Sequence, residues 1–347
     1  MRTERTAKPI EFTNQVLTFC TESHILLSTE PDTPLVMRIF AHDAYHVGSF
    51  NLCGEFMDIK EHQPPLSVEE QIENLKHLGL VIDDDDSAVT FLNDVSYFRF
   101  IKAYSLGWKP KNGKYQAGTS FHMLKELYLF NSNFRQLLFP LIERVEINLR
   151  CRLANYFCVK YGVLGYMDPA NFADEQYHNE FLHDMNIEVE RNAKAPFVKN
   201  FRQNYVDGTI PLYALVELFS FGTLSKFFKN MKNLDKKAVA KMYNIGYTYF
   251  ESWIESVAFV RNICAHYGRL YNGNLAKSPM LYKQYQGISN LRIYAILLCL
   301  KQLLPNDLHW IQFVDTLELL IEKYPSVQIQ LMGFPENWKE LLVDGAR

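Results

Sequence analysis

The sequence contains little glycine and proline, 16 and 14 among 347 residues, and it has no internal repeat and no low-complexity tract. Helix-breaking residues are therefore sparse, and a hydrophobic fraction of 48% with a charged fraction of 22% excludes a largely disordered chain. Over long stretches apolar residues recur at steps of three and four, which is the period of an amphipathic helix. The sequence predicts an all-α protein.

The cysteines lack the spacing of a disulfide framework or of a zinc site. None of them forms a C-x-x-C pair, and none stands at a zinc-ligand spacing from a histidine. We therefore expect reduced core thiols in a cytosolic protein. No cluster of carboxylates and histidines argues for a metal, and we expect no cofactor. The six cysteines are Cys20, Cys53, Cys151, Cys158, Cys264 and Cys299.

No apolar run is long enough to cross a membrane. The most apolar stretch, residues 289–304, contains Arg292 and Lys301 and is shorter than the roughly 20 residues that a spanning helix needs. Near the N-terminus, Asn14 and Gln15 interrupt any signal-like apolar core. These absences predict a cytoplasmic protein without a membrane partner.

The net charge of −3 hides an uneven distribution. Residues 1–98 hold 6 basic against 17 acidic side chains, a net −11. Residues 99–160 hold 11 against 3, a net +8, and residues 191–242 hold 10 against 3, a net +7. The two basic stretches suggest a polyanionic partner for the middle of the chain. Solvated helix faces would give the same numbers, and on charge alone that interpretation comes first.

Local signals predict the main elements. Ser67 with Glu70 forms a capping box that opens a helix ended by Gly79, and the acidic run at 83–86 leads into a second helix. An Asn-Gly turn within residues 109–114 predicts one small β-hairpin. Further helices are expected over residues 133–160, 211–231, 247–267, 289–304 and 308–323.

The chain divides into three expected segments. Residues 1–60 lack clean periodicity and are interpreted as an N-terminal extension of uncertain order. Met57 precedes the first convincing helix signal, which leaves a misassigned start codon open. Residues 61–275 are expected to form the helical core, and residues 276–347 a C-terminal helical segment.

One face of the helix expected over 133–160 is polar. Glu143, Glu146 and Arg150 lie within roughly 60° of one another on an ideal helix, and the last two are i,i+4 partners. They form either an exposed ion-paired face, worth about 0.3–0.5 kcal/mol, or a polar wall beside a site. For the second role Arg150 is the preferred residue.

Residues 261–269 contain the side chains best suited to chemistry. Asn262 and His266 share a helix face, whereas Arg261 lies about 140° from His266 around an ideal helix. One straight helix does not aim both at one atom, so either the helix end distorts or a second chain completes the site. Gly268 offers the helix a stop. Alone, the Arg-x4-His spacing is weak evidence, and a helix-capping histidine with a surface arginine is the favoured interpretation.

Four ordered blocks of residues extend around this segment, over about residues 62–275. They are 63–71 (QPPLSVEEQ) with 78–80 and 97–99; 141–150 (LIERVEINLR) with 161–162 and 165–169; 211–213 with 217–225 (ELFSFGTLS); and 251–253 with 261–266 (RNICAH) and 269–272. In this order the blocks resemble the Abi-like phage abortive-infection family.

The resemblance implies a HEPN-type helical bundle with additional helices, in a superfamily of RNA-cutting toxins and defence proteins. The signature of that superfamily places Arg261, Asn262 and His266 in the site. HEPN proteins generally dimerise so that two motifs face each other, which implies a homodimer. A subgroup carries a modified tyrosine two residues after the histidine. Here Gly268 stands at that place and Tyr267 comes one residue early, which argues against such control.

The expected function is a metal-independent endoribonuclease toxin of phage defence in the bacterial cytoplasm. His266 suits proton transfer near neutrality, Arg261 can fork onto phosphate oxygens, and Asn262 can orient either group. The products would be a 2′,3′-cyclic phosphate and a 5′-hydroxyl, and DNA would not be cut. Candidate RNA-binding or supporting residues are Arg150, Glu146, Arg144, Arg99, Tyr97, Tyr267 and Arg269.

Two other functions stay open. A binding module would grip a structured regulatory RNA, such as some Abi-like proteins have encoded beside them, without cutting it, although pure binding gives no reason for His266. A scaffold dimer would use the motif structurally, and it predicts that His266→Ala destabilises the fold.

Overall fold

The computed structural model describes residues 64–109, 112–304 and 308–344, together with the backbone of three short strands closer to the N-terminus. The chain divides into two units, Met1–Pro65 and Leu66–Arg347. In the first unit three strands pair antiparallel in the order β1-β2-β3, namely β1 (Ile25–Leu26), β2 (Val36–Ile39) and β3 (Phe50–Asn51). Apart from these strands, the predictions made for residues 1–60 and for Met57 concern residues outside the described ones.

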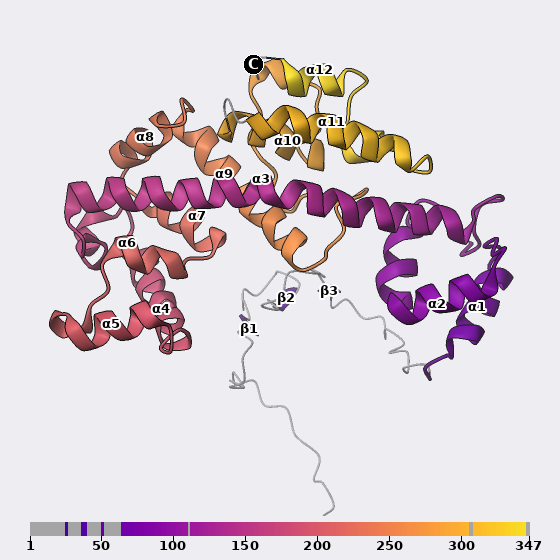
Figure 1. Ribbon diagram of the computed structural model, residues 1–347, viewed down its shortest axis with the longest axis horizontal. Coiled ribbons are helices and arrows are strands. Elements are labelled where there is room, and N and C mark those ends of the chain that lie inside the picture. Colours follow the sequence, from indigo (N-terminus) through magenta and orange to yellow (C-terminus); the bar gives the residue numbers. More distant parts are fainter. Residues whose placement is uncertain are drawn as a thin grey trace, which may run out of the picture. The chain divides into compact units, whose positions relative to one another are not determined.

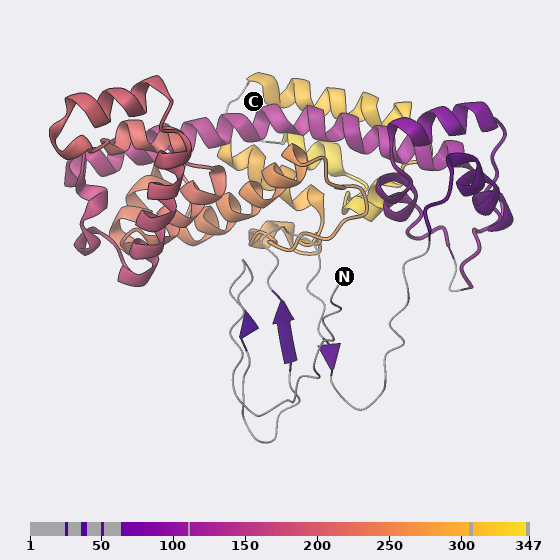
Figure 2. The same ribbon diagram turned by 90° about the horizontal axis from the view of Figure 1, so that it is seen from below.

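The second unit is all-α, as expected, and is organised on one long helix (Figures 1 and 2). This helix, α3 (Phe121–Tyr161), has 41 residues. At 1.5 Å per residue it is about 60 Å long. The other α-helices are α1 (Val68–His77), α2 (Asp85–Asp94), α4 (Glu175–Arg191), α5 (Pro196–Asn204), α6 (Leu212–Leu215), α7 (Phe221–Asn230), α8 (Asn233–Lys241), α9 (Tyr247–Ala265), α10 (Ile293–Leu303), α11 (Leu308–Lys323) and α12 (Trp338–Val343).

Most of these helices pack directly against α3. Helices α6 to α9 contact it, and so do α10 and α11 of the C-terminal segment. Short helical turns connect the longer elements: η1 (Phe98–Lys102), η2 (Gly165–Met167), η3 (Pro169–Asn171), η4 (Val206–Gly208), η5 (Val216–Leu218), η6 (Lys283–Tyr285) and η7 (Ile329–Met332). Within the part of the chain that the structure describes, no helix is both long and apolar enough to span a membrane.

The apolar stripe that predicts α3 is confirmed as core. Its five residues are each at most 1% exposed: Leu138, Ile142, Val145, Leu149 and Leu153. The helix begins earlier than the expected residue 133, because Ser120 caps it by accepting a hydrogen bond from the Met123 amide. The polar residues near 133 belong to the helix, and Asn133 donates to the Tyr324 hydroxyl at 2.8 Å.

The local helix signals at the start of this unit are confirmed. Ser67 Oγ accepts from the Glu70 amide at 3.2 Å, and Glu70 Oε2 accepts from the Ser67 amide at 2.7 Å. Gly79 follows α1 with φ +88°, a conformation that costs glycine nothing. Asp84 caps α2 within the acidic run. Each of these signals lies within a few residues of the element that it controls.

The β-hairpin predicted within 109–114 is wrong for the residues of that loop that the structure describes, which exclude 110 and 111. One backbone hydrogen bond closes the loop, from the Gln116 amide to the Trp108 carbonyl at 2.9 Å. The next rung does not form, because the Tyr115 amide donates to the Leu78 carbonyl at 2.8 Å instead. Packing of this loop against the end of α1 therefore replaces strand pairing.

The single helix predicted over 211–231 is also wrong, because the structure divides it into α6, η5 and α7. The chain is extended at Phe219, and the Ser220 side chain then caps α7. The carbonyls exposed by this break are bound by Arg150, which lies on α3. A contact so distant in sequence leaves no trace in the local pattern.

The expectation of core thiols holds for Cys264 and Cys299, which are buried, and is wrong for Cys151, which is exposed. Cys151 lies four residues from the exposed Ile147, on the solvent face of α3. Cys158 is half-buried. Cys20 and Cys53 lie outside the described residues.

A buried carboxylate fixes α8 to the end of α3. Asp235 is fully buried and accepts from the hydroxyls of Tyr156 and Tyr161 at 2.6 and 2.7 Å. Lys160 forms an ion pair with the same carboxylate. Burial opposes the charged form, but these three hydrogen bonds prevail and hold the pKa of Asp235 below its ordinary value.

We expect Asp235→Ala to lower the free energy of unfolding by about 3 kcal/mol, because two phenols and one ammonium lose their acceptor. Urea denaturation measures this. Since the folded-state pKa lies below the unfolded one, the contribution is present above the unfolded pKa and is lost as the pH falls through the folded one. The matched control is Asp184→Ala, which removes an exposed carboxylate on α4. Equal losses for both variants would contradict the role of Asp235.

Candidate functional site

The predicted motif lies at the C-terminal end of α9. Asn262 and His266 are exposed, and the Arg261 side chain is 30% exposed. The helix is regular through Ala265, and His266 is the residue that caps it. No distortion within α9 therefore turns His266 toward Arg261, and the two side chains keep their separation of about 140°.

The helix ends in a Schellman motif. The Gly268 amide donates to the Ile263 carbonyl at 2.7 Å, and the Tyr267 amide donates to the Cys264 carbonyl at 3.3 Å. The left-handed residue is Tyr267, with φ +58°, so the helix stops one residue earlier than Gly268 predicts. For a residue with a side chain this conformation costs about 1–2 kcal/mol, so other contacts must stabilise it.

The buried side chain of Asn131 on α3 supplies some of these contacts. It accepts from the Leu270 amide at 2.7 Å and from the Tyr271 amide at 3.0 Å, and it donates to the Gly268 carbonyl at 3.3 Å. The Asn131 side chain is 2% exposed, and its two bonds from the Leu270 and Tyr271 amides are buried. Asn131 therefore fixes the path of the chain directly after the motif.

Two arginines hold the same segment from other directions. Arg135 on α3 donates to the Gly268 carbonyl at 3.1 Å, and Arg99 on η1 donates to the Tyr267 carbonyl at 3.1 Å. The Arg135 guanidinium also lies 5.8 Å from the centre of the Tyr267 ring, a cation–π distance. The Tyr267 side chain is still 69% exposed.

Sequence reasoning missed Asn131 and Arg135. They precede Leu138 and Ile142 by seven residues each, on the buried stripe of α3. A polar residue on an otherwise apolar stripe requires a buried hydrogen-bonding partner. That pattern could have marked both positions, although not the segment that they bind.

Glu146 connects α3 to the motif. Its Oε2 accepts from Arg261 Nε at 3.2 Å, and its Oε1 accepts from Arg150 Nη2 at 3.0 Å. The Glu146 side chain is only 11% exposed. Arg261 binds this carboxylate through Nε. Its two terminal nitrogens form no hydrogen bond or ion pair with the described residues. Those nitrogens are the pair that grips phosphate oxygens.

Arg150 occupies its donors within the protein. Its Nη1 donates to the Val216 and Glu217 carbonyls at 3.0 and 2.9 Å, and its Nη2 donates to the Phe219 carbonyl at 2.9 Å. The side chain is 14% exposed. The pair that it forms with Glu146 is therefore largely buried, and the alternative of an exposed ion-paired face does not apply to it.

The remaining predicted residues lie in the segment after the motif, directly before η1, and on α3. Arg269 is half-buried in the segment after the motif, and burial, together with Arg292, lowers the pKa of its guanidinium. Tyr97 immediately precedes η1 and is half-buried, and burial raises the pKa of its hydroxyl. Arg144 is half-buried on α3, two residues before Glu146.

The chemistry available at the motif is that of histidine, arginine and asparagine. Among the described residues, no group of three or more His, Cys, Asp or Glu side chains is placed to hold a metal ion. Burial raises the pKa of the Cys264 thiol to about 12. That thiol stays protonated near neutral pH and is not a nucleophile there.

A cavity of about 620 Å³ between α4, α7 and α9 reaches the motif. Its wall on α9 includes Glu251, Glu255, Phe259 and Asn262, which follow one face of the helix. His266 is the next residue on that face, one turn further on. The cavity therefore opens toward the motif from the side that carries Asn262.

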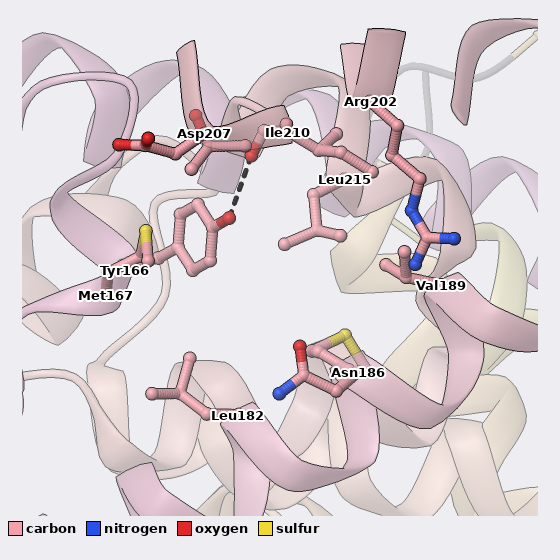
Figure 3. Close-up of a pocket in the computed structure, with 12 residues that line it drawn as sticks. Tyr166, Met167, Leu182, Asn186, Val189, Arg202, Asp207, Ile210 and Leu215 are labelled. Carbon is pink, nitrogen blue, oxygen red and sulfur yellow. Dashed lines mark hydrogen bonds between the residues drawn. The ribbon is translucent and has the colours of Figure 1, made fainter. Parts of the chain in front are cut away.

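A second cavity, of about 550 Å³, lies among α4, α5 and the segment around η4 (Figure 3). Tyr166 lines it and donates its hydroxyl to the Ile210 carbonyl at 2.8 Å. Leu182, Asn186 and Arg202 line other sides. It contains no residue of the motif.

Fold and site together define an all-α protein that presents an arginine, an asparagine and a histidine at the end of a helix packed on α3. The model of the Abi-like protein family matches residues 90–272, more than half of the chain and the whole motif. The chain belongs to this family, whose name points to phage defence by abortive infection. No curated protein and no solved structure matches it.

We expect Arg150→Gln to lower the free energy of unfolding by about 2–3 kcal/mol, because three carbonyls at the break before α7 lose a charged donor. Thermal and urea denaturation measure the loss. Arg191→Gln is the matched control, since Arg191 forms an exposed pair with Glu188 on α4, and exposed pairs contribute little. An unchanged stability for Arg150→Gln would show that its hydrogen bonds do not support the fold.

Proposed function

We propose that the protein is a metal-independent endoribonuclease of phage abortive infection, with Arg261, Asn262 and His266 as its active residues. The observation that carries the proposal is the placement of Arg261. Its Nε is held by a largely buried Glu146 while both terminal nitrogens stay open, five residues before an exposed histidine. Membership of the Abi-like family supports the biological setting.

The proposed reaction needs no group beyond these side chains. His266 accepts the proton of the ribose 2′-hydroxyl as the 2′-oxygen forms its bond to phosphorus. Arg261 binds the phosphate oxygens on which negative charge increases. The bond to the 5′-oxygen then breaks, and that oxygen leaves with the proton that His266 has taken up. A 2′,3′-cyclic phosphate and a 5′-hydroxyl result.

A homodimer is part of this proposal. Arg261 and His266 of one chain diverge by about 140° on a regular helix, so a site that uses both draws them from two chains. A two-fold dimer brings the same surface of each chain together and produces two such sites. One proposed partner is therefore a second copy of this chain. The other is RNA in the bacterial cytoplasm, which serves as the substrate and, in a structured form, as a regulator.

We expect expression of the wild type to stop bacterial growth and to leave new cyclic-phosphate RNA ends, with phage challenge supplied as a trigger. Arg261→Ala and His266→Ala should abolish both effects at matched soluble levels, because each removes a group that acts in the transition state. Growth curves and sequencing of RNA ends measure this. Protection from phage that survives both substitutions would overturn the nuclease mechanism and favour the RNA-binding module.

We expect a mixture of the Arg261→Ala and His266→Ala proteins to regain about a quarter of the wild-type cleavage rate. Half of the randomly formed dimers would be mixed, and each would hold one complete site of two. Cleavage of an RNA oligonucleotide after co-refolding or co-expression measures the recovery. A mixture as inactive as its components would place the site within a single chain.

A further inference from the structure

Four arginines surround the chain segment that follows the motif. Arg99 and Arg135 donate to carbonyls of this segment directly after His266. Arg269 belongs to the segment. Arg292 donates to its far end, to the Asn272 side chain at 3.1 Å and the Gly273 carbonyl at 3.3 Å. We call Arg99, Arg135, Arg269 and Arg292 the arginine cluster.

The arginine cluster has no counter-charge in the described part of the chain. None of its four members forms an ion pair with a carboxylate there. The end of α9 contributes the negative pole of a helix dipole, but this amounts to about half an elementary charge. Four guanidinium charges therefore face one partial charge, and a local positive potential remains.

The members of the cluster lie close to one another. Their contacts fall on one short segment, because Arg99 and Arg135 bind the carbonyls of residues 267 and 268 while Arg292 binds residues 272 and 273. Arg135 is 7% exposed, and its Nε has no hydrogen-bond partner in the described structure. A buried donor without an acceptor is costly, and arginine charges gathered without a counter-charge repel one another. A bound anion would offset the repulsion among these charges.

Capping of the segment's carbonyls accounts for only part of this arrangement. It explains one hydrogen bond from Arg99 and two from Arg292. Each of these guanidinium groups carries five N–H donors, so most of the donors are left over. It does not explain Arg269, whose side chain forms no hydrogen bond or ion pair with described residues. Nor does it explain why four cations gather without a carboxylate.

We propose that the arginine cluster binds a backbone phosphate of RNA, next to the phosphate that is held at Arg261 and His266. The identity of the anion rests on the proposed function. The exposed ring of Tyr267 lies between His266 and Arg269 in the chain, where it is placed to stack on the base between the two phosphates. The cluster therefore extends the site from one phosphate to two.

RNA binding by cleavage-deficient protein tests the proposal. In a His266→Ala background, Arg99→Gln and Arg269→Gln are each compared with Arg191→Gln, which changes an exposed arginine on α4. Fluorescence anisotropy with a labelled single-stranded RNA oligonucleotide is recorded over a range of salt concentrations. We expect each cluster variant to bind about 5–10-fold more weakly and to reduce the slope of log K against log salt by about 0.7, the value of one lost phosphate contact.

A second measurement separates an RNA phosphate from a free anion. Binding of an anion to the folded protein alone raises its melting temperature. We expect sodium sulfate to raise the melting temperature more than sodium chloride of equal ionic strength does, and Arg269→Gln to lose this difference. If sulfate stabilises the protein but the cluster variants bind RNA like the control, the cluster is a site for a free anion and the RNA proposal is wrong.

Failure of this inference and failure of the nuclease are distinguishable. Weaker RNA binding by the cluster variants, combined with a wild type that leaves no cyclic-phosphate ends, would retain the phosphate site and reject the nuclease. Normal binding by the cluster variants, combined with cleavage by the wild type, would reject only the phosphate site. Absence of RNA binding by any of the proteins would reject the phosphate site as well.

Discussion

One carboxylate, that of Glu146, determines the geometry on which the site depends. Its two oxygens bind Arg150 and Arg261, which lie on different helices. Arg150 in turn binds the carbonyls at the break before α7. Without the carboxylate, two guanidinium groups would face each other in a poorly solvated region, a costly arrangement. One group therefore links the arginine that binds the break before α7 to the arginine of the motif.

How well the sequence predicts each element depends on where its controlling hydrogen bonds are made. The helices that begin at Ser67 and Asp84 are predictable, because each cap bonds an amide three residues away. The break at Phe219 is not, because its carbonyl is bound by a side chain 69 residues earlier. Hydrophobic periodicity does not register such a contact, and a continuous helix is the natural prediction.

The same distinction applies to the candidate site. The order and spacing of Arg261, Asn262 and His266 are visible in the sequence, and the family match covers them. The groups that hold the segment after His266 are not visible, because Asn131 is 139 residues away from the Leu270 amide that it binds. The only local sign was a polar residue at a position of the buried stripe.

The strained conformation at Tyr267 shows what these distant contacts achieve. A left-handed tyrosine costs about 1–2 kcal/mol, and it persists because the hydrogen bonds of Asn131, Arg135 and Arg99 fix the carbonyls and amides around it. The result is an exposed histidine at the end of a helix whose following segment is held by these contacts. The proposed ribonuclease would rely on side chains already positioned where charge develops. The strain at Tyr267 is therefore consistent with a segment whose geometry serves the site as well as the termination of α9.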